Sequence, residues 1–229
     1  MTKEHKVIFQ DLKDIRYKDA WDYQEKIFKN LLDYKFHPSD KEKKQFLLFC
    51  EHPNVYTLGK SGSEGNLLLN QVGLKDKQVE YFKTNRGGDI TYHGPGQIVG
   101  YPIIDLEEQQ IGVKNYIQKL EEAIILTLKD YGIEAERLKG SIGVWLDADN
   151  DKARKICAIG VKSSRYITMH GFAFNVNTNL EFFNYINPCG FVDKGVTSMQ
   201  KELGKKLDYS EVSLNVKEKL AEVFGFKYE

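Results

Sequence analysis

The segment from Arg86 to Tyr101 constrains this chain most strongly, because five of its sixteen residues are glycine although strand-like runs precede and follow it. Glycine allows positive φ and lets a ligand or a second backbone approach closely, since it has no Cβ. Side chains that donate, accept or stack stand among these glycines: Arg86, Thr91, Tyr92, His93 and Gln97. A plain turn needs only one or two glycines and indifferent polar neighbours. We therefore predict that this segment forms the wall of a binding site.

The bulk composition is that of one large domain, and we expect residues 1–229 to form it. Hydrophobic residues make up 41% of the chain and aromatic residues 12%, which is enough for a sizeable core. Lys plus Arg and Asp plus Glu number 33 each, a balance that argues against a nucleic acid or a membrane surface as the main partner. No apolar run approaches the ~20 residues of a membrane span. The charged start does not resemble a signal peptide, so we expect a cytoplasmic location.

Neither the cysteines nor the acidic residues are spaced like metal ligands. Cys50, Cys157 and Cys189 are an odd number at scattered positions without a CxxC pair, which indicates reduced thiols and no structural zinc. The loop from Asp147 to Asp151 lacks the further oxygen ligands of a calcium loop and is typical of a solvated turn. This loop is longer than its hairpin needs, and the sequence leaves its role open.

Hydrophobic periodicity predicts three substantial helices, and we expect an α+β fold with a mixed or antiparallel sheet covered by them. The helices cover Tyr17–Tyr34, Val113–Tyr131 with Gly132 as the residue that ends it, and a last one from an Asp208 N-cap to Gly225. The predicted strands are 6–11, 45–51, 55–58, 79–84, 98–106, 135–139, 142–146, 155–162 and 167–176, with a short helix at 180–186. The strands and helices do not alternate regularly, which argues against a doubly wound parallel sheet.

Cys189 is the best candidate for a nucleophile, because Pro188 stiffens the backbone before it and Gly190 frees the backbone after it. A cysteine is more often a small buried hydrophobe, which is what we expect for Cys50 and Cys157. A reactive thiol needs a neighbour that favours the thiolate.

Two lysines and two histidines could be that neighbour. Strict alternation along the strand puts Lys155 on the face of Cys157 and Ile159, and puts Lys162 on the face of Ile156 and Ala158, without choosing between the lysines. His93 and His170 each precede a glycine and are either partners of the thiol or satisfied core histidines.

Four segments together resemble the octanoyltransferases of lipoate assembly. Arg86-Gly-Gly-x-x-Thr-Tyr-His-x-Pro-Gly-Gln-x-x-x-Tyr101 is similar to that family's glycine-rich signature. Arg154-Lys-Ile-Cys-Ala-Ile-Gly160, His170-Gly-Phe-Ala-Phe-Asn175 and Asn187-Pro-Cys-Gly190 follow in the family's order. Four motifs in register make the resemblance specific, whereas the glycine segment alone would not.

The resemblance implies a fold shared with lipoate-protein and biotin ligases, a mixed central sheet flanked by helices. It also implies that Cys189 is the nucleophile and that Lys155 lowers the pKa of its thiol and acts as general acid and base. The implied substrate wall comprises Arg86, Gly87, Gly88, Asp89, Ile90, Thr91, Tyr92, His93, Ala158, Ile159, Gly160, Gly171, Phe172 and Ala173, with His170 and Gln97 in support.

The implied reaction moves an octanoyl group from octanoyl-acyl carrier protein to a lysine of a lipoyl domain through an acyl-cysteine thioester, without a cofactor. Acceptors in this family are the lipoyl domains of 2-oxoacid dehydrogenase complexes and the H protein of glycine cleavage. An ATP-dependent lipoate or biotin ligase, a lipoyl-domain amidotransferase and a catalytically inactive binding module are the alternatives. The sequence does not fix the preferred acyl length, the preferred acceptor or the oligomeric state. For the acidic carrier we predict a basic docking patch of Lys152, Arg154, Lys162 and Arg165.

Overall fold

The computed structural model describes residues 5–38, 43–187 and 194–229, and their largest element is a mixed sheet of nine strands. The strand order is β12–β1–β2–β6–β10–β9–β8–β7, and β11 pairs with β9. The strands are β1 His5–Asp14, β2 Phe46–Glu51, β6 Gln97–Ile103, β7 Glu136–Leu138, β8 Ser141–Leu146, β9 Arg154–Ser164, β10 Ile167–Asn175, β11 Gly195–Val196 and β12 Phe226–Tyr228. β1 runs parallel to both of its neighbours, β2 and β12, whereas β2, β6, β10, β9, β8 and β7 are successively antiparallel. The predicted mixed sheet is confirmed.

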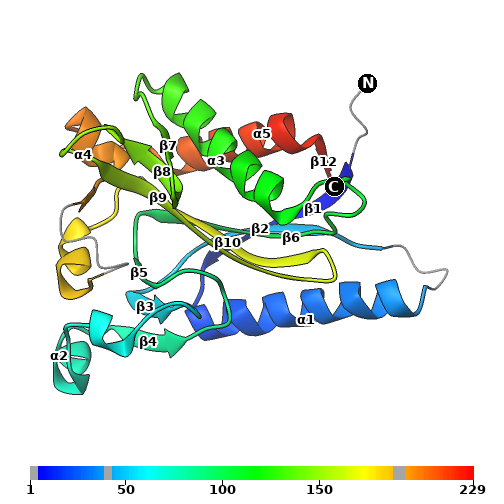
Figure 1. Cartoon of the computed structure of the whole chain (residues 1–229), viewed down its shortest axis with the longest axis horizontal. Helices are drawn as coiled ribbons and strands as arrows, with labels where there is room; N and C mark the ends of the chain where they lie inside the picture. The colour runs from blue at the N-terminus through cyan, green and yellow to red at the C-terminus, as the bar shows by residue number, and fades with distance from the viewer. Residues whose placement is uncertain (1–4, 39–42, 188–193) are drawn as a thin grey trace.

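Helices cover both faces of this sheet, as Figure 1 shows, with α1 (Tyr17–Phe36) on one side and α3 (Val113–Asp130) and α5 (Tyr209–Phe224) on the other. The apolar stripe of α3 packs against α5 and the sheet in the larger core. α5 begins where the Asp208 carboxylate accepts hydrogen bonds from the next backbone N–H groups, and Gly225 ends it in the left-handed region. The three predicted helices are confirmed. Within the described ranges, no helix combines the length and apolarity needed to cross a lipid bilayer.

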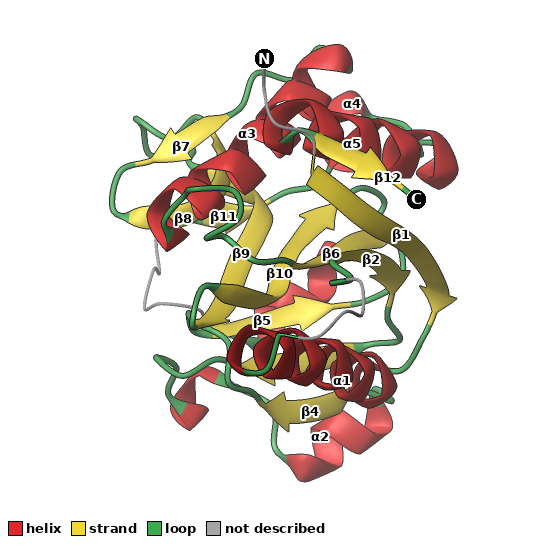
Figure 2. Ribbon diagram, turned by 90° about the vertical axis from the view of Figure 1, so that its right-hand side faces the viewer, coloured by secondary structure: helices red, strands yellow, loops and turns green. Residues whose placement is uncertain are grey.

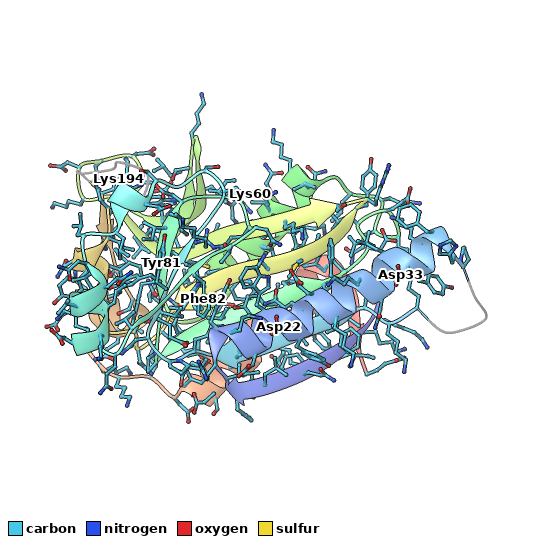
Figure 3. All side chains as sticks on the ribbon, turned by 90° about the horizontal axis from the view of Figure 1, so that it is seen from below. Asp22, Asp33, Lys60, Tyr81, Phe82 and Lys194 are labelled. Carbon is cyan, nitrogen blue, oxygen red and sulfur yellow. The ribbon has the colours of Figure 1, made fainter. Side chains whose placement is uncertain are left out.

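A second sheet, with strand order β4–β3–β5, lies beside the start of α1 (Figure 2). Its strands are β3 Val55–Leu58, β4 Glu80–Lys83 and β5 Ile90–His93. Phe82 of β4 contacts Tyr17, the first residue of α1, with 5.5 Å between ring centroids (Figure 3). More than half of the glycine-rich segment is therefore strand rather than loop, since β5 and the first part of β6 belong to it. Ile90 and Tyr92 of β5 pack with Tyr56 in a third apolar cluster.

Several short elements escaped prediction: α2 Gln71–Asp76, α4 Met199–Leu203, β11 and β12. Each has six residues or fewer, which is too short to display a period of 3.6 or of 2. The segment predicted as a short helix at 180–186 is a 3₁₀ helix, η2 (Leu180–Tyr185), and a one-turn 3₁₀ helix, η1 (Glu64–Asn66), lies in the loop after β3.

Candidate active site

A patch of small side chains on β6, β10 and β9 forms the floor of a cavity. Ala173 of β10 lies opposite Val99 of β6 on one side and opposite Ala158 of β9 on the other. Two residues further along, Gly171 lies opposite Gly160. Residues two apart point to the same face of a sheet, so these rows share one surface. Because their side chains are small or absent, that surface stays hollow and bounds a cavity of about 1230 Å³.

The roof of the cavity is the glycine-rich segment. Gly87 N donates a hydrogen bond of 2.8 Å to Val161 O, which brings the segment down onto β9. A Cβ on Gly160 would lie 2.9 Å from Gly87 O, so side chains larger than hydrogen are excluded from this approach. Gly88 has a φ of +83°, which favours glycine. The glycines that the sequence singled out thus act in close backbone contacts.

Most of the predicted substrate wall lines this cavity: Arg86, Gly87, Gly88, Asp89, Ile90, Thr91, His93, Ala158, Ile159, Gly160, Gly171, Phe172 and Ala173. The predicted acid and base, Lys155, and the supporting residues Gln97 and His170 line it too. Tyr92 does not. Its ring stacks on Phe182 of η2 at 4.9 Å between centroids, and its hydroxyl donates to Asn54 Oδ1 at 2.7 Å. The side chain of Tyr92 therefore packs in the apolar cluster beside η2 instead of lining the cavity, which corrects its place in the predicted wall.

Arg86 is buried in the lining of the cavity and holds the roof in shape. Its Nη2 donates to the carbonyl oxygens of Thr57 and Asp89 at 2.6 and 2.8 Å, and its Nη1 donates to Gly87 O at 2.9 Å. These bonds fix the segment from Arg86 to Asp89 against β3. A guanidinium whose N–H groups bind carbonyls is also a fixed positive charge beside the cavity.

The two histidines of the cavity are neutral. His93 donates from Nδ1 to Gln97 Oε1 at 2.9 Å, since the Gln97 amide nitrogen itself donates to Asn175 Oδ1. The Thr57 hydroxyl, which accepts from Arg86, donates to His93 Nε2 at 3.2 Å. Burial lowers the pKa of His93 and of His170 to about 3, and the charge of Arg86 adds to both shifts.

His170 has an unusual backbone, and its ring makes one hydrogen bond among the residues that the structure describes. Its φ is +59° in the middle of β10, and its backbone N–H donates to Gln24 Oε1 at 3.0 Å. Its Nε2 donates to Asn85 Oδ1 at 2.7 Å, while Nδ1 has no partner among the residues that the structure describes. Strained backbone of this kind persists where the surroundings hold it, and here α1 and Asn85 do so.

Lys155 is partly exposed and lines the cavity where the register of β9 shifts. Val144 of β8 is opposite Cys157 but Trp145 is opposite Lys155, so Ile156 is an extra residue on β9. The shift breaks the strict alternation that we expected: Cys157 is buried in the core, whereas Lys155 and Ala158 both line the cavity. The cavity lining does not include Lys162, whose Nζ lies 4.7 Å from the ring centroid of Phe28 on α1. The geometry therefore distinguishes the two lysines, which alternation could not.

Comparison with known proteins identifies the family. The model of the lipoyl protein ligase A/B catalytic domain matches residues 16–221. An octanoyltransferase of Bacteroides fragilis (strain YCH46) is 53% identical, covering 90% of this chain and 93% of the relative. An octanoyltransferase of Christiangramia forsetii is 52% identical, covering 98% of this chain and 95% of the relative. The chain belongs to the octanoyltransferases of this family.

Octanoyltransferases are acyltransferases, and solved structures confirm the fold predicted for this member. A lipoate protein ligase from Thermoplasma acidophilum superposes with a TM-score of 0.71 at 14% identity, over 98% of this chain and 86% of the ligase. The biotin protein ligase from Aquifex aeolicus superposes with a TM-score of 0.53 at 13% identity, over 95% of this chain and 70% of the ligase.

The predicted nucleophile of this octanoyltransferase, Cys189, lies outside the described residues. The residues that flank the gap, Asn187 and Lys194, both line the cavity. Cys50 and Cys157 are free thiols in the core, as expected, and burial raises the pKa of both.

The predicted basic patch is not one surface. Arg154 at the start of β9 is held by Glu202, with two hydrogen bonds of 2.7 Å, and by Asp147. Lys162 and Arg165 lie near the other end of β9, about 25 Å away for an extended strand. Asp147 of the acidic loop is thus an ion-pair partner. No cluster of three or more acidic, histidine or cysteine side chains suited to a metal occurs among the described residues.

Several residues of the site escaped the sequence analysis. Thr57 and Asn175 align the hydrogen bonds of Arg86, His93 and Gln97. Thr57 stands alone in a short apolar strand, and Asn175 belonged to a quoted motif without being assigned a role. Asn85 directly precedes Arg86, and this position next to the glycine-rich segment is the sequence signal that could have identified it as a site residue. Trp145 and Gly143 of β8 adjoin Lys155 only because β8 pairs with β9, and strand pairing is not readable from one strand.

Proposed function

We propose that this octanoyltransferase takes its acyl group from octanoyl-acyl carrier protein and delivers it to a lysine of a lipoyl domain, with an acyl thioester on Cys189 as the intermediate. This is the first step of protein lipoylation made from endogenous octanoate. Lipoyl domains of 2-oxoacid dehydrogenase complexes and the H protein of glycine cleavage are the proposed acceptors.

One observation supports the proposal most directly. Lys155 lines a cavity whose lining also includes Asn187 and Lys194, the two residues that flank the segment containing Cys189. Furthermore, β11 pairs with β9 at Lys155, and Thr197 N donates to Lys155 O at 2.9 Å. The chain after the proposed nucleophile is therefore tied to the proposed acid and base.

The proposed chemistry uses Lys155 twice. As an ammonium it stabilises the Cys189 thiolate, which attacks the carrier thioester; the departing pantetheine thiolate then takes a proton from Lys155. The neutral Lys155 amine next accepts the proton that the acceptor lysine loses when its nitrogen attacks the acyl-enzyme. The C–S bond breaks, the amide forms and the Cys189 thiolate returns beside an ammonium.

The cavity offers an apolar slot for the eight-carbon chain. Val99, Ala158, Ala173 and Phe172 line it, and the rows that they form lead from Lys155 toward Arg86. Each methylene buried there contributes roughly 0.8 kcal/mol to binding. The neutral histidines suit this purpose, because a charged imidazole beside an alkyl chain would remain poorly solvated.

Intact-mass spectrometry tests the proposal. The protein is mixed with octanoyl-acyl carrier protein in the absence of ATP, and we expect a mass increase of one octanoyl group. Cys189→Ala should abolish the increase, whereas the matched variant Cys50→Ala should retain it, because Cys50 is buried outside the cavity. An adduct that appears only with free octanoate and ATP, and persists in Cys189→Ala, would instead assign ATP-dependent ligase chemistry. Donation from an octanoylated lipoyl domain but not from the carrier would assign the amidotransferase reaction.

We further propose that residues 1–229 form one catalytic domain, in keeping with the family match over residues 16–221. A cytoplasmic location is part of the proposal, and it is supported by the reduced state of Cys50 and Cys157, which is normal for cytosolic proteins.

A further inference from the structure

The side chain of Lys155 lies along β8, where its ammonium group contacts the face of an aromatic ring. Lys155 and Trp145 are directly opposite each other on β9 and β8, and Lys155 Nζ lies 4.6 Å from the centroid of the indole. Trp145 is 2% exposed, and its Nε1 donates to Ser141 O at 3.2 Å, which fixes the orientation of the ring. Both side chains line the cavity.

Gly143 makes this arrangement sterically feasible. Its φ is +123°, and a Cβ there would lie 2.6 Å from Cys157 O and 3.4 Å from both Cδ and Cε of Lys155. Gly143 N donates to Glu121 Oε1 at 3.0 Å, and Arg137 Nε donates to Glu121 Oε2 at 3.0 Å. The methylene groups of Lys155 therefore cross a glycine whose position α3 fixes.

The shift of register at Ile156 completes the arrangement. Without the extra residue, Lys155 would share the face of Cys157 and enter the core. With it, the ammonium reaches the cavity from a strand whose next residues are buried. Gly143, the extra residue Ile156 and the indole of Trp145 therefore all contribute to the position of Lys155 Nζ.

We propose that Trp145 is a positioning residue that holds the Lys155 ammonium at the mouth of the cavity and favours its protonated form by a cation–π contact. The inference rests on the proposed function, since it concerns the acid and base of that reaction. Tryptophan has the most attractive ring face for a cation, and the attraction strengthens where water is excluded, as beside this buried indole. The ring attracts the ammonium but not the neutral amine, so it acts on the equilibrium between them.

The consequence is a defined pH dependence. The reaction needs the ammonium when the Cys189 thiolate forms and needs the amine when the acceptor lysine attacks. Without the ring, the Lys155 ammonium loses its proton at a lower pH. The highest pH at which Lys155 supports the thiolate is therefore lower. The proton balance of the reaction is unchanged, because Lys155 still gives one proton to the pantetheine thiolate and regains one from the acceptor lysine.

The first test compares Trp145→Leu and Trp145→Phe with the unchanged protein. With octanoyl-acyl carrier protein we expect Trp145→Leu to lower kcat by about tenfold or more and to move the basic limb of the kcat profile down by about one pH unit. KM should change by less than about threefold, because Trp145 is proposed to position Lys155 and not to bind the substrate. Trp145→Phe, which keeps a weaker aromatic face, should lie between the two. Trp21→Phe on α1 is the matched control and should leave the profile unchanged.

The second test reads the contact without turnover. Trp21 and Trp145 are the only tryptophans of the chain. In a Trp21→Phe background, the emission of Trp145 should therefore titrate with Lys155, and Lys155→Met should abolish that titration. This readout remains valid even if Trp145→Leu folds poorly.

The outcomes separate the inference from the proposed function. The role of Trp145 would be overturned if all Trp145 variants showed normal acylation and identical pH profiles. It would also be overturned if the emission of Trp145 still titrated in Lys155→Met. Either result would leave the octanoyl transfer intact. Absence of the Cys189 adduct in the unchanged protein would overturn the proposed function while the emission still reports the contact.

Discussion

Ala158 and Ala173 stand opposite each other on β9 and β10, and their methyl groups form the middle of the cavity floor. Ala173 is 4% exposed, and its other neighbour across the sheet is Val99. Larger side chains in this row would fill the space between the sheet and the glycine-rich roof. The volume available to an acyl chain is thus set by two alanines.

Ala173→Leu should therefore shorten the acyl chain that the enzyme accepts. The added methylene groups occupy the middle of the slot, and relief by backbone movement is restricted by Gly160 and Gly87. We expect the ratio of kcat/KM for octanoyl to that for butanoyl carrier protein to fall about tenfold or more. Ala123→Leu in the core of α3 is the control for destabilisation and should leave that ratio unchanged.

Lys155→Arg should separate the two halves of the proposed reaction. Arginine keeps a positive charge near the thiol, but it does not give up its proton and cannot accept one from the acceptor amine. We expect acyl-enzyme to form within about tenfold of the normal rate, because a pantetheine thiolate can leave as the anion and take its proton from water. Transfer to a lipoyl domain should slow by about a hundredfold or more, because the acceptor amine then has no base. Single-turnover mass spectrometry follows both steps. Normal transfer by Lys155→Arg would contradict the role of Lys155 as a base.

The long elements were predictable from the sequence because their signals are local. The helix that ends before Gly132 and the helix that begins after Asp208 carry both a period of 3.6 residues and their own stop or start residues. The glycines between Gly87 and Gly96 predicted close contacts for the same reason, since the lack of a Cβ is a property of the residue itself.

The errors at the site have a different origin, because they depend on how two strands pair. A single extra residue, Ile156, reverses the alternation on which the assignment of Lys155 to the face of Cys157 depended. Tyr92 was assigned to the cavity wall because its neighbours belong there, but β5 turns its ring toward Phe182. The basic patch failed because Glu202, far away in sequence, neutralises Arg154.

Acid should destabilise the fold through its buried histidines. The folded-state pKa of His93 and of His170 is about 3, against about 6.5 in an unfolded chain, so the unfolded state binds protons first as the pH falls. Their contribution to stability is complete above pH 6.5 and declines toward pH 3. Between pH 6.5 and 5 we expect a loss of about 2 kcal/mol for each of the two.

Urea midpoints measured across this pH range check the effect. His37→Gln, at the exposed end of α1, is the control and should show the same change of urea midpoint with pH as the unchanged protein. A stability that is constant between pH 6.5 and 5 would show that these imidazoles are hydrated or charged in the fold.

Exposed apolar side chains at the mouth of the cavity should contact the protein substrates. Leu68 is 61% exposed and Ile142 51%, and both line the cavity although they come from separate parts of the chain. Large exposed apolar groups around a cavity are typical of interaction sites.

We expect Ile142→Asp to raise KM for octanoyl-acyl carrier protein by about tenfold, because one apolar anchor is lost and a negative charge faces an acidic partner. With a small octanoyl thioester, which fills the cavity but does not touch the rim, kcat/KM should stay within about twofold. Leu214→Asp, on exposed surface of α5 outside the cavity lining, is the matched control. Equal losses with the carrier and with the small thioester would place Ile142 in the acyl slot instead of on a docking rim.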